Sequence, residues 1–329
     1  MKSRVIVINE TYSEFIDVLK GVAILFVLLN HTIPTDIKKY IGFDLWAGLG
    51  VPLFLLIQSF HFFKKKDYAG IHYSRILTKL IIPYLIAQIS VFVIKCTLGV
   101  TMKDIFGDFC ESLGFGPGEY YIWIYLQFLL LLPFVGWVFK SLSQKHVWII
   151  SIICCMALEI FCSYTIDDDH VYKFLFFRYS FILFLGYLWG KYGIVLNMVY
   201  MLLTFVSIVS IIVFDYIGMD LEPIFYNSLE WKCFHWIIYF YPFALLPFIL
   251  RKIYLALPEY LKSVLISMGR NSWYIFCLQI VVFSFMSKKV FRFIGNDDVA
   301  GFLYLICSIM LSIVLVIYPA KLSHKLKWL

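Results

Sequence analysis

Three ionisable side chains lie in one apolar segment near the start of the chain. In the run EFIDVLKGVAILFVLLNHTIP these are Asp17, Lys20 and His31, and Asn30 precedes the histidine. A neutral imidazole can take a proton from an attacking hydroxyl near neutral pH, which is the task of a general base. Each ionisable residue inside a membrane span costs at least roughly 2.5 to 3.5 kcal/mol on insertion scales. We therefore treat each of the three as a functional candidate.

The spacing of these residues predicts one polar stripe along a helix. Lys20 and His31 are separated by about three helical turns and an axial rise of about 16 Å, so both project from the same face. Asp17 lies three residues before Lys20 and can pair with it on that face. The alternative is a histidine bonded to a carbonyl near the outer end of a span, together with a lysine whose ammonium reaches the interface.

Basic and polar residues flank the next two apolar runs. Gln58 and Ser59 interrupt GLGVPLFLLIQSF, where they can bond to neighbouring helices, and both are candidates for substrate contacts. Arg75 and Lys79 lie one turn apart at the start of the third run, and with Lys64 to Lys66 they form a basic cluster suited to phosphate groups. For at least half of these charges the alternative is an ordinary positive-inside topology signal.

Five further residues are candidates for substrate contacts because each is polar or amphipathic within an apolar run: Tyr121, Trp123, Gln127, Arg178 and Gln279. Arg178 cannot lose its proton, so within a span it must face a carboxylate, carbonyls or a water-lined cavity. Glu159 in the adjacent run is a possible partner. The two aromatic residues belong to a stripe that fits the interface belt better than a sugar-stacking platform, although the two roles are compatible.

The composition places all these residues in a membrane protein. Of 329 residues, 62% are hydrophobic and only 15% are charged, against roughly 45 to 50% and about 25% in soluble domains. We expect one membrane domain over residues 1–329, with no appended soluble domain. The net charge of +7 reflects basic cytoplasmic loops rather than a nucleic-acid partner. The cysteines lack zinc-type spacing, so we expect neither a metal site nor a disulfide framework. The N-terminus lacks a signal-peptide layout.

Windows of about 20 apolar residues predict ten spans in an all-α bundle. They lie near residues 14–33, 43–63, 76–98, 120–139, 147–165, 173–190, 193–215, 233–250, 271–287 and 300–319. The distribution of Lys and Arg predicts that both termini are cytoplasmic. No internal repeat is evident, which counts mildly against a secondary transporter.

These motifs resemble the acyltransferase-3 family of integral membrane acyltransferases. The run from Asp17 to His31 is similar to the family's opening D-x-L-R-G-x-A-x-x-x-V-x-x-x-H, with Lys20 in place of Arg. GVPLFLLIQSF resembles G-V-P-L-F-F-x-x-S-G-F, and RILTKLIIPY resembles R-x-x-R-x-x-x-P-Y with a wider basic pair. GRNSWYIFCLQ resembles a later block in which Gln279 replaces a frequent His. The similarity runs from about residue 13 to 320.

The resemblance implies transfer of an acyl group, commonly acetyl, from acyl-CoA to a sugar hydroxyl in a surface polysaccharide or its lipid-linked precursor. It implies a multi-pass protein of the bacterial inner (plasma) membrane, with acetyl-CoA as co-substrate and no metal. The expected partners are acyl-CoA, a sugar or glycolipid acceptor and membrane lipid, without nucleic acid; the oligomeric state is left open. It assigns His31 as the catalytic histidine, Lys20 as its basic partner, and Arg75 with Lys79 as the cytoplasmic basic pair.

The spacing of the stripe is compatible with this activity. Lys20, Arg75 and Lys79 can hold the phosphates at the inner face, while the pantetheine arm lies along the first helix toward His31. Donors for the oxyanion can come from Asn30, or from the amides in later runs, Gln127 and Gln279. Two alternatives remain: a transporter or flippase for a lipid-linked sugar or small anion, and a non-catalytic family relative. The departures at Lys20 and Gln279 leave room for an inactive member.

Overall fold

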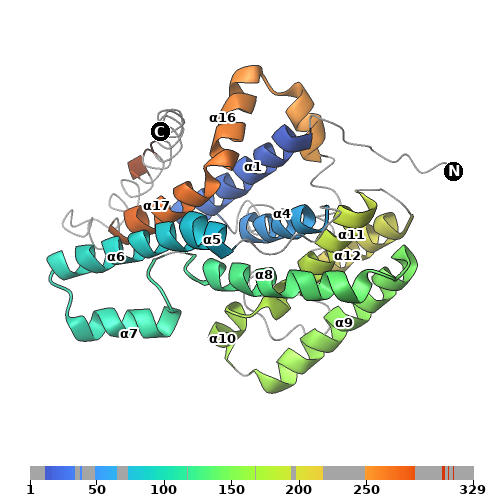
Figure 1. The fold of residues 1–329 in the computed structure, drawn as a ribbon, viewed down its shortest axis with the longest axis horizontal. Coiled ribbons are helices and arrows are strands. Elements are labelled where there is room, and N and C mark those ends of the chain that lie inside the picture. The colour runs from blue at the N-terminus through green and yellow to red at the C-terminus, as the bar shows by residue number, and fades with distance from the viewer. Residues whose placement is uncertain are drawn as a thin grey trace. The chain divides into compact units, whose positions relative to one another are not determined.

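The fold is all-α in the part of the chain that the structure describes. The computed structural model describes residues 12–33, 38, 49–64, 73–116, 118–166, 168–193, 198–217, 249–285, 306–307, 310 and 314. Every regular element in these ranges is a helix, as Figure 1 shows, which confirms the predicted class. Four helical stretches are long and apolar enough to cross a membrane: Glu14–Thr32, Leu77–Thr97, Tyr120–Phe139 and Gln144–Thr165.

These four stretches coincide with four of the ten predicted spans, and other helices occupy four more. These other helices are α4 (Gly50–Lys64), α11 (Ser180–Tyr192), α12 (Met198–Tyr216) and α17 (Ser272–Phe285). The predicted spans 233–250 and 300–319 lie outside the described residues except at a few positions, and so do both termini. The number of spans and the side of the termini therefore stay predictions.

The chain divides into two compact units, which are described separately. The first unit comprises Met1–Ile16, Asp44–Gly70 and Ile122–Pro258, and the second comprises Asp17–Phe43, Ile71–Tyr121 and Glu259–Leu329. Helix α1 (Tyr12–Thr32) lies almost wholly in the second unit, and α8 (Tyr120–Phe139) almost wholly in the first. The predicted site residues are thus distributed over both units.

The first unit is built on close packing of α4 against α11. Every residue of α11 from Ser180 to Trp189 is buried. Gly186 and Gly190 lie one turn apart, and a Cβ on Gly186 would collide with Ser59 of α4. Small residues at this spacing let two helix backbones approach closely in a membrane protein.

The predicted span 173–190 is wrong as a single helix. It is broken into α10 (Asp169–Lys173), a 3₁₀ turn η2 (Phe176–Tyr179) and α11. No Gly or Pro marks the break in the sequence, so helical periodicity could not locate it. A break frees backbone groups that need partners, and Gln127 of α8 supplies them, as described below.

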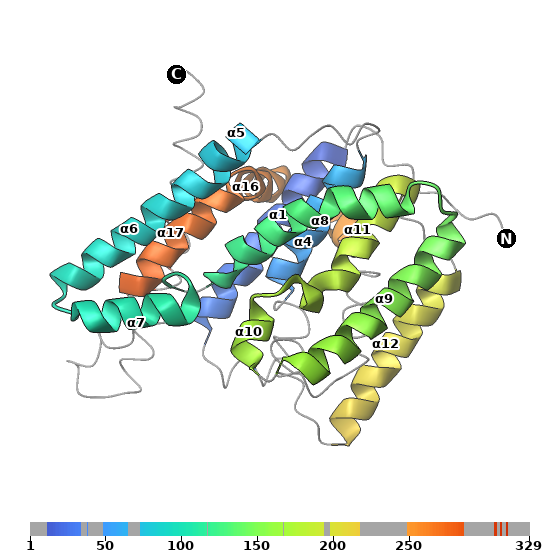
Figure 2. The same cartoon turned by 60° about the horizontal axis from the view of Figure 1, so that its bottom comes forward.

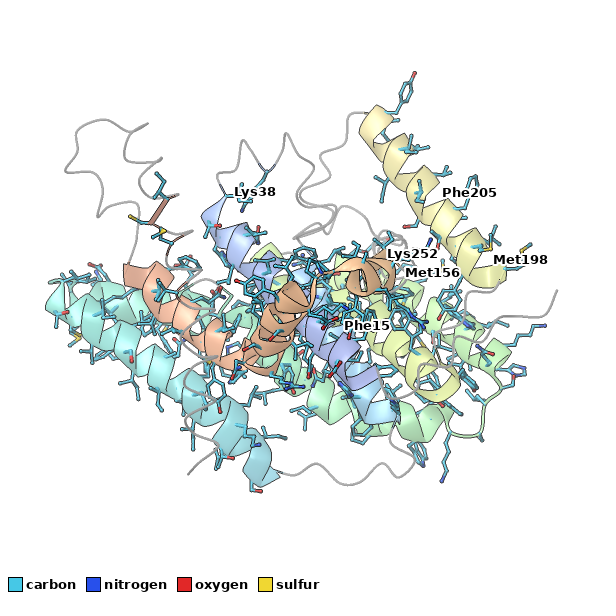
Figure 3. The ribbon with its side chains drawn as sticks, turned by 90° about the horizontal axis from the view of Figure 1, so that it is seen from above. Phe15, Lys38, Met156, Met198, Phe205 and Lys252 are labelled. Carbon is cyan, nitrogen blue, oxygen red and sulfur yellow. The ribbon has the colours of Figure 1, made fainter. Side chains whose placement is uncertain are left out.

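One face of α12 carries exposed apolar side chains. Met198 and Phe205 project away from α12 in Figure 3, and both are exposed. Because the helix is apolar over almost its whole length, this face suits contact with lipid.

The second unit packs α17 along α6 (Ile82–Thr97), as Figure 2 shows. A short helix α5 (Tyr73–Ile76) and a π turn η1 (Leu77–Ile81) precede α6. Pro83, near the start of α6, has no N–H to donate, and a π turn is one way in which a helix accommodates such a loss. The indole of Trp273 in α17 donates to the carbonyl of Leu80 at 3.2 Å, which fixes the turn against α17.

Helix α1 is the most buried of the four long apolar stretches. Of its apolar stretch 61% is buried, against 22% to 39% for the other three. Its backbone approaches α16 (Glu259–Arg270) closely, because a Cβ on Gly21 would collide with Leu265 and one on Gly269 would collide with Asp17. The polar residues of α1 thus lie on a helix that contacts protein for most of its length.

Candidate functional site

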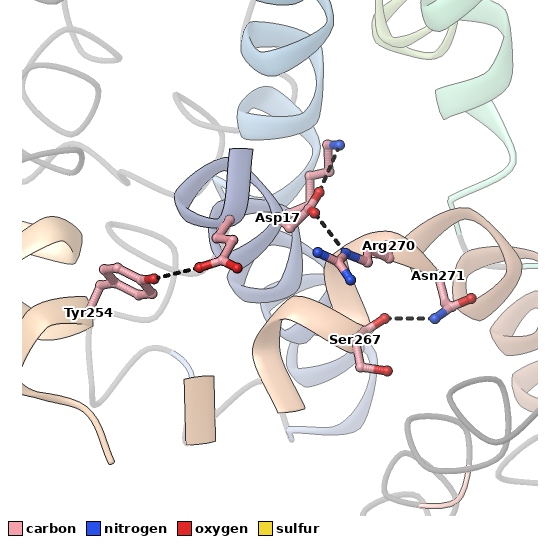
Figure 4. A network of polar contacts seen from close by, with 7 residues as sticks. Asp17, Tyr254, Ser267, Arg270 and Asn271 are labelled. Carbon is pink, nitrogen blue, oxygen red and sulfur yellow. Dashed lines mark hydrogen bonds and ion pairs between the residues drawn. The ribbon is translucent and has the colours of Figure 1, made fainter. Parts of the chain in front are cut away.

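Asp17 accepts contacts from two cations in the second unit (Figure 4). Lys20 Nζ lies 3.4 Å from Asp17 Oδ1, which confirms the predicted pair, and Arg270 Nε lies 3.0 Å from Asp17 Oδ2. The carboxylate side chain is 14% exposed, against 28% for Lys20 and 56% for Arg270. One largely buried carboxylate therefore orients two more exposed cations, and the cluster keeps a net positive charge.

Arg270 was not among the residues selected from the sequence. It belongs to the GRNSW motif, but nothing local indicates a partner 253 residues away. Asp17 is its only hydrogen-bond or ion-pair partner within the described residues. A guanidinium has five N–H donors, so Arg270 keeps donors for an anion while Asp17 holds its orientation.

The predicted basic pair lies at the same end of the second unit. Lys79 is exposed on the π turn η1, and the backbone of Arg75 belongs to α5; the side chain of Arg75 lies outside the described part. The bond from Trp273 Nε1 to the Leu80 carbonyl joins the residue after Lys79 to the first turn of α17. Arg270 lies just before that turn. Lys20, Arg270 and Lys79 are thus brought to one end of this unit.

His31 lies toward the other end of α1. The helix is unbroken from Tyr12 to Thr32, so the axial rise of about 16 Å between Lys20 and His31 holds. The imidazole ring lies 6.1 Å from the ring of Phe283 in α17, centroid to centroid, at an interplanar angle of 52°. α17 therefore supplies one wall beside the predicted base.

Asn30 is held by Lys38, another residue that sequence reasoning did not select. The Lys38 ammonium donates to Asn30 Oδ1 at 3.0 Å and also to the Asn30 carbonyl. Because the amide oxygen is the atom that is held, the amide nitrogen of Asn30 remains a donor. This is the polarity that a predicted oxyanion donor requires.

Tyr121 and Gln279 are both buried in the second unit. The Tyr121 ring packs edge-on against Phe276 at 5.2 Å between centroids, so it belongs to the core rather than to an interface belt. Gln279 is fully buried one turn before Phe283 on α17. Neither amide atom of Gln279 has a hydrogen-bond partner in the described chain.

Both polar atoms of the Gln127 amide in the first unit bond to backbone. Its Nε2 donates to the Phe174 carbonyl at 2.7 Å, and its Oε1 accepts from the Phe176 N–H at 2.9 Å. The side chain thus bridges the break between α10 and η2. A substrate or oxyanion contact from Gln127 stays a prediction, and it would compete with these two bonds.

The other predicted substrate contacts of the first unit have varied surroundings. Gln58 Nε2 donates to the Tyr125 carbonyl at 3.3 Å, and Ser59 is buried against α11. Trp123 is partly exposed. Arg178 is buried in the 3₁₀ turn η2, with its guanidinium 5.4 Å from the Tyr179 ring centroid.

Glu159, considered as a partner for Arg178, accepts a hydrogen bond from the Tyr172 hydroxyl at 3.4 Å. Among the described residues, no group of three or more His, Cys, Asp or Glu side chains is placed to hold a metal ion. Within the described residues, the structure assembles a cation cluster on Asp17 in the second unit and a buried pair of Glu159 with Tyr172 in the first. Two further ion pairs join Lys95 to Asp108 and Lys262 to Glu259.

Helices long enough to cross a membrane define a polytopic membrane protein. The chain matches the acyltransferase domain family over residues 13–321, nearly its whole length, and it therefore belongs to the acyltransferase-3 family. No curated protein and no solved structure matches the chain. The protein is a membrane acyltransferase in this general sense, and the family predicted from its motifs is confirmed.

Proposed function

We propose that this protein is an O-acyltransferase of the bacterial inner (plasma) membrane. It moves an acyl group, commonly acetyl, from acyl-CoA to a hydroxyl of a sugar in a cell-surface polysaccharide or its lipid-linked precursor. One observation supports the proposal best. A single unbroken and largely buried helix carries an ion-paired cation, Lys20, in its first half and the predicted base, His31, about 16 Å further along.

The cation cluster suits the phosphate-rich end of acyl-CoA. Asp17 orients Lys20 and Arg270. Lys79 lies at the same end of the second unit, directly after the short helix α5, which contains Arg75. Charge-assisted hydrogen bonds from Arg and Lys to phosphate are stronger than neutral ones. The pantetheine arm then follows α1 toward His31.

The chemical step is direct transfer between two bound substrates. His31 takes the proton of the acceptor hydroxyl as its oxygen attacks the thioester carbonyl. The carbonyl oxygen becomes an oxyanion, to which the Asn30 amide donates. When the carbonyl re-forms, the bond to sulfur breaks, and the CoA thiolate leaves with the proton from the imidazolium. Loss of a general base typically costs 10² to 10⁴-fold in rate, on the order of what we expect for His31.

Substituting His31 tests the proposal. The full chain in lipid nanodiscs is incubated with radiolabelled acetyl-CoA and surface glycan, and acetyl transfer is measured beside CoA binding. We expect His31→Ala to lower transfer by at least about 10²-fold and to leave CoA binding intact. His146 is exposed at the start of α9 (Gln144–Thr165), bonded only locally to Ser143, so His146→Ala is the matched control.

Other outcomes would contradict the proposed function. Transfer that survives His31→Ala would remove the histidine from the chemistry. Movement of a lipid-linked sugar without acyl-CoA consumption would support a flippase instead. Lys20→Ala should weaken CoA binding, whereas Lys262→Ala on α16, whose ammonium pairs with Glu259, should not.

A further inference from the structure

A glycine-rich loop after α7 (Met102–Ser112) is anchored by one buried glutamine. The Phe115 N–H donates to Gln88 Oε1 at 2.6 Å, and Gln88 Nε2 donates to the Phe115 carbonyl at 3.2 Å. Gly116 and Gly118 have φ of +82° and +85°, in the left-handed region that glycine favours. The backbone at Phe115 is therefore held against α6.

Two glycines of the loop lie directly on buried hydroxyl groups. A Cβ on Gly114 would lie 2.7 Å from the Tyr84 hydroxyl of α6, and a Cβ on Gly116 would lie 2.6 Å from the Ser284 hydroxyl of α17. A methyl group fits at neither place. The absence of side chains here brings bare backbone over two polar atoms.

The third glycine lies over an amide. A Cβ on Gly118 would contact the Phe276 ring at 3.1 Å and would lie 4.0 Å from Gln279 Nε2. Gln279 is fully buried, and Tyr84 is 6% exposed. The loop thus covers a platform made by Tyr84, Gln279 and Ser284.

The polar atoms of this platform lack hydrogen bonds. The Tyr84 and Ser284 hydroxyls and both amide atoms of Gln279 are buried and have no partner in the described part of the chain. More than about 90% of buried polar groups in proteins are bonded to protein or ordered water. Four orphaned atoms beneath one loop therefore point to a ligand that would satisfy them.

The chemistry of the platform selects the class of ligand. Its groups are neutral, and together they donate and accept hydrogen bonds, as hydroxyl groups do. The buried Glu119 lies beside the loop, with its Cβ 3.0 Å from the Cβ position of Gly114, which disfavours an anion.

We propose that Tyr84, Gln279 and Ser284 form the subsite for a neutral, polyhydroxylated acceptor. The inference rests on the proposed function for the identity of the acceptor as a sugar. Ser284 follows Phe283 on α17, and the Phe283 ring lies 6.1 Å from the His31 ring, centroid to centroid. The same helix therefore carries two residues of the subsite and a neighbour of the predicted base.

Sugar binding without acyl-CoA tests this subsite separately from transfer. The full chain in nanodiscs is dialysed against a tritium-labelled equimolar mixture of the methyl glycosides of glucose, galactose and mannose. We expect wild-type protein to bind the mixture and the double variant Tyr84→Phe, Gln279→Leu to bind it at least about fivefold more weakly. Thermal unfolding of the variant should match the wild type, because the removed atoms have no partners to lose.

Tyr187→Phe is the matched control. Its buried hydroxyl donates to the Phe139 carbonyl at 2.8 Å in the first unit, so its loss should lower thermal stability and leave sugar binding unchanged. Equal binding by the double variant and wild type would overturn the subsite. So would absent binding by wild type, or stronger binding of glucose 6-phosphate. Any of these results with intact His31-dependent transfer would leave the proposed function standing.

Discussion

Gln127 of the first unit and Gln279 of the second unit have similar sequence contexts but different surroundings in the structure. Each interrupts an apolar helix, and each was predicted to contact substrate. The amide nitrogen and oxygen of Gln127 both form hydrogen bonds to the backbone, at Phe174 and Phe176. Within the described chain, neither amide atom of Gln279 forms a hydrogen bond. A buried amide with two partners has a structural task, and one without partners is available for a ligand.

Gln88 uses its amide in the same way as Gln127, to bond a backbone N–H and a backbone carbonyl. It holds Phe115 through the same two amide atoms with which Gln127 holds the break before η2. In both places the chain leaves a helix, and one glutamine satisfies a backbone N–H and a carbonyl that the helix no longer pairs. The second unit therefore contains both kinds of glutamine within two adjacent helices, α6 and α17.

The largest effect should come from Gln127→Leu. The change leaves the partly buried Phe174 carbonyl and Phe176 N–H without this partner, and an orphaned buried group costs about 1 to 3 kcal/mol. We expect a loss of about 2 to 4 kcal/mol in the free energy of unfolding, measured by denaturant titration in detergent. A variant as stable as wild type would show that the contrast with Gln279 has no energetic basis.

Gln88→Leu should also destabilise the protein, by about 2 kcal/mol or more, since Phe115 loses both backbone partners. Because the backbone at Phe115 is then unanchored, hydrogen exchange at Phe115 should accelerate. Ser90→Ala on the same helix is the control, as its hydroxyl bonds only to the Ile86 carbonyl one turn back. Unchanged exchange at Phe115 would contradict the anchoring role.

Gly116→Ala should destabilise the protein more than Gly99→Ala. Both glycines have positive φ, so both variants bear a strain of about 1 to 2 kcal/mol. Only at Gly116 would the new Cβ also press on Ser284 and Ile280, since nothing lies within 4 Å of the Cβ position of Gly99. The difference should be about 1 to 3 kcal/mol in thermal unfolding. Equal losses would mean that the loop does not rest tightly on α17.

Gln279→Leu should have the smallest effect on stability. No hydrogen bond is lost in the described chain, and burying an apolar group in place of an unpaired amide is neutral or favourable. We expect an unfolding temperature equal to or above that of wild type, together with weaker sugar binding. A marked drop in the unfolding temperature would show that the Gln279 amide stabilises the fold as the Gln127 amide does, and the two residues would no longer differ.

Prediction from the sequence succeeded where the relevant contacts are local. The apolar run 14–33 is the helix Tyr12–Thr32, and the pair of Asp17 with Lys20 forms as the three-residue spacing requires. It failed at the helix break before η2 and at α7, an amphipathic helix between two predicted spans. The break lies inside a long apolar window and α7 has no such window, so windows of this kind, which were the signal used to find helices, could locate neither feature.

The amino-acid sequence by itself determined the membrane class, the family, the main apolar helices and the ion pair within α1. These follow from composition and from residues within one or two turns of each other, so no knowledge of distant segments is needed. Only the tertiary structure decided that Arg270 joins Asp17, that Lys38 holds Asn30, and that Gln127 is bonded while Gln279 is not. The fate of a buried polar group depends on which remote backbone or side chain packs against it, and that choice is made by the fold as a whole.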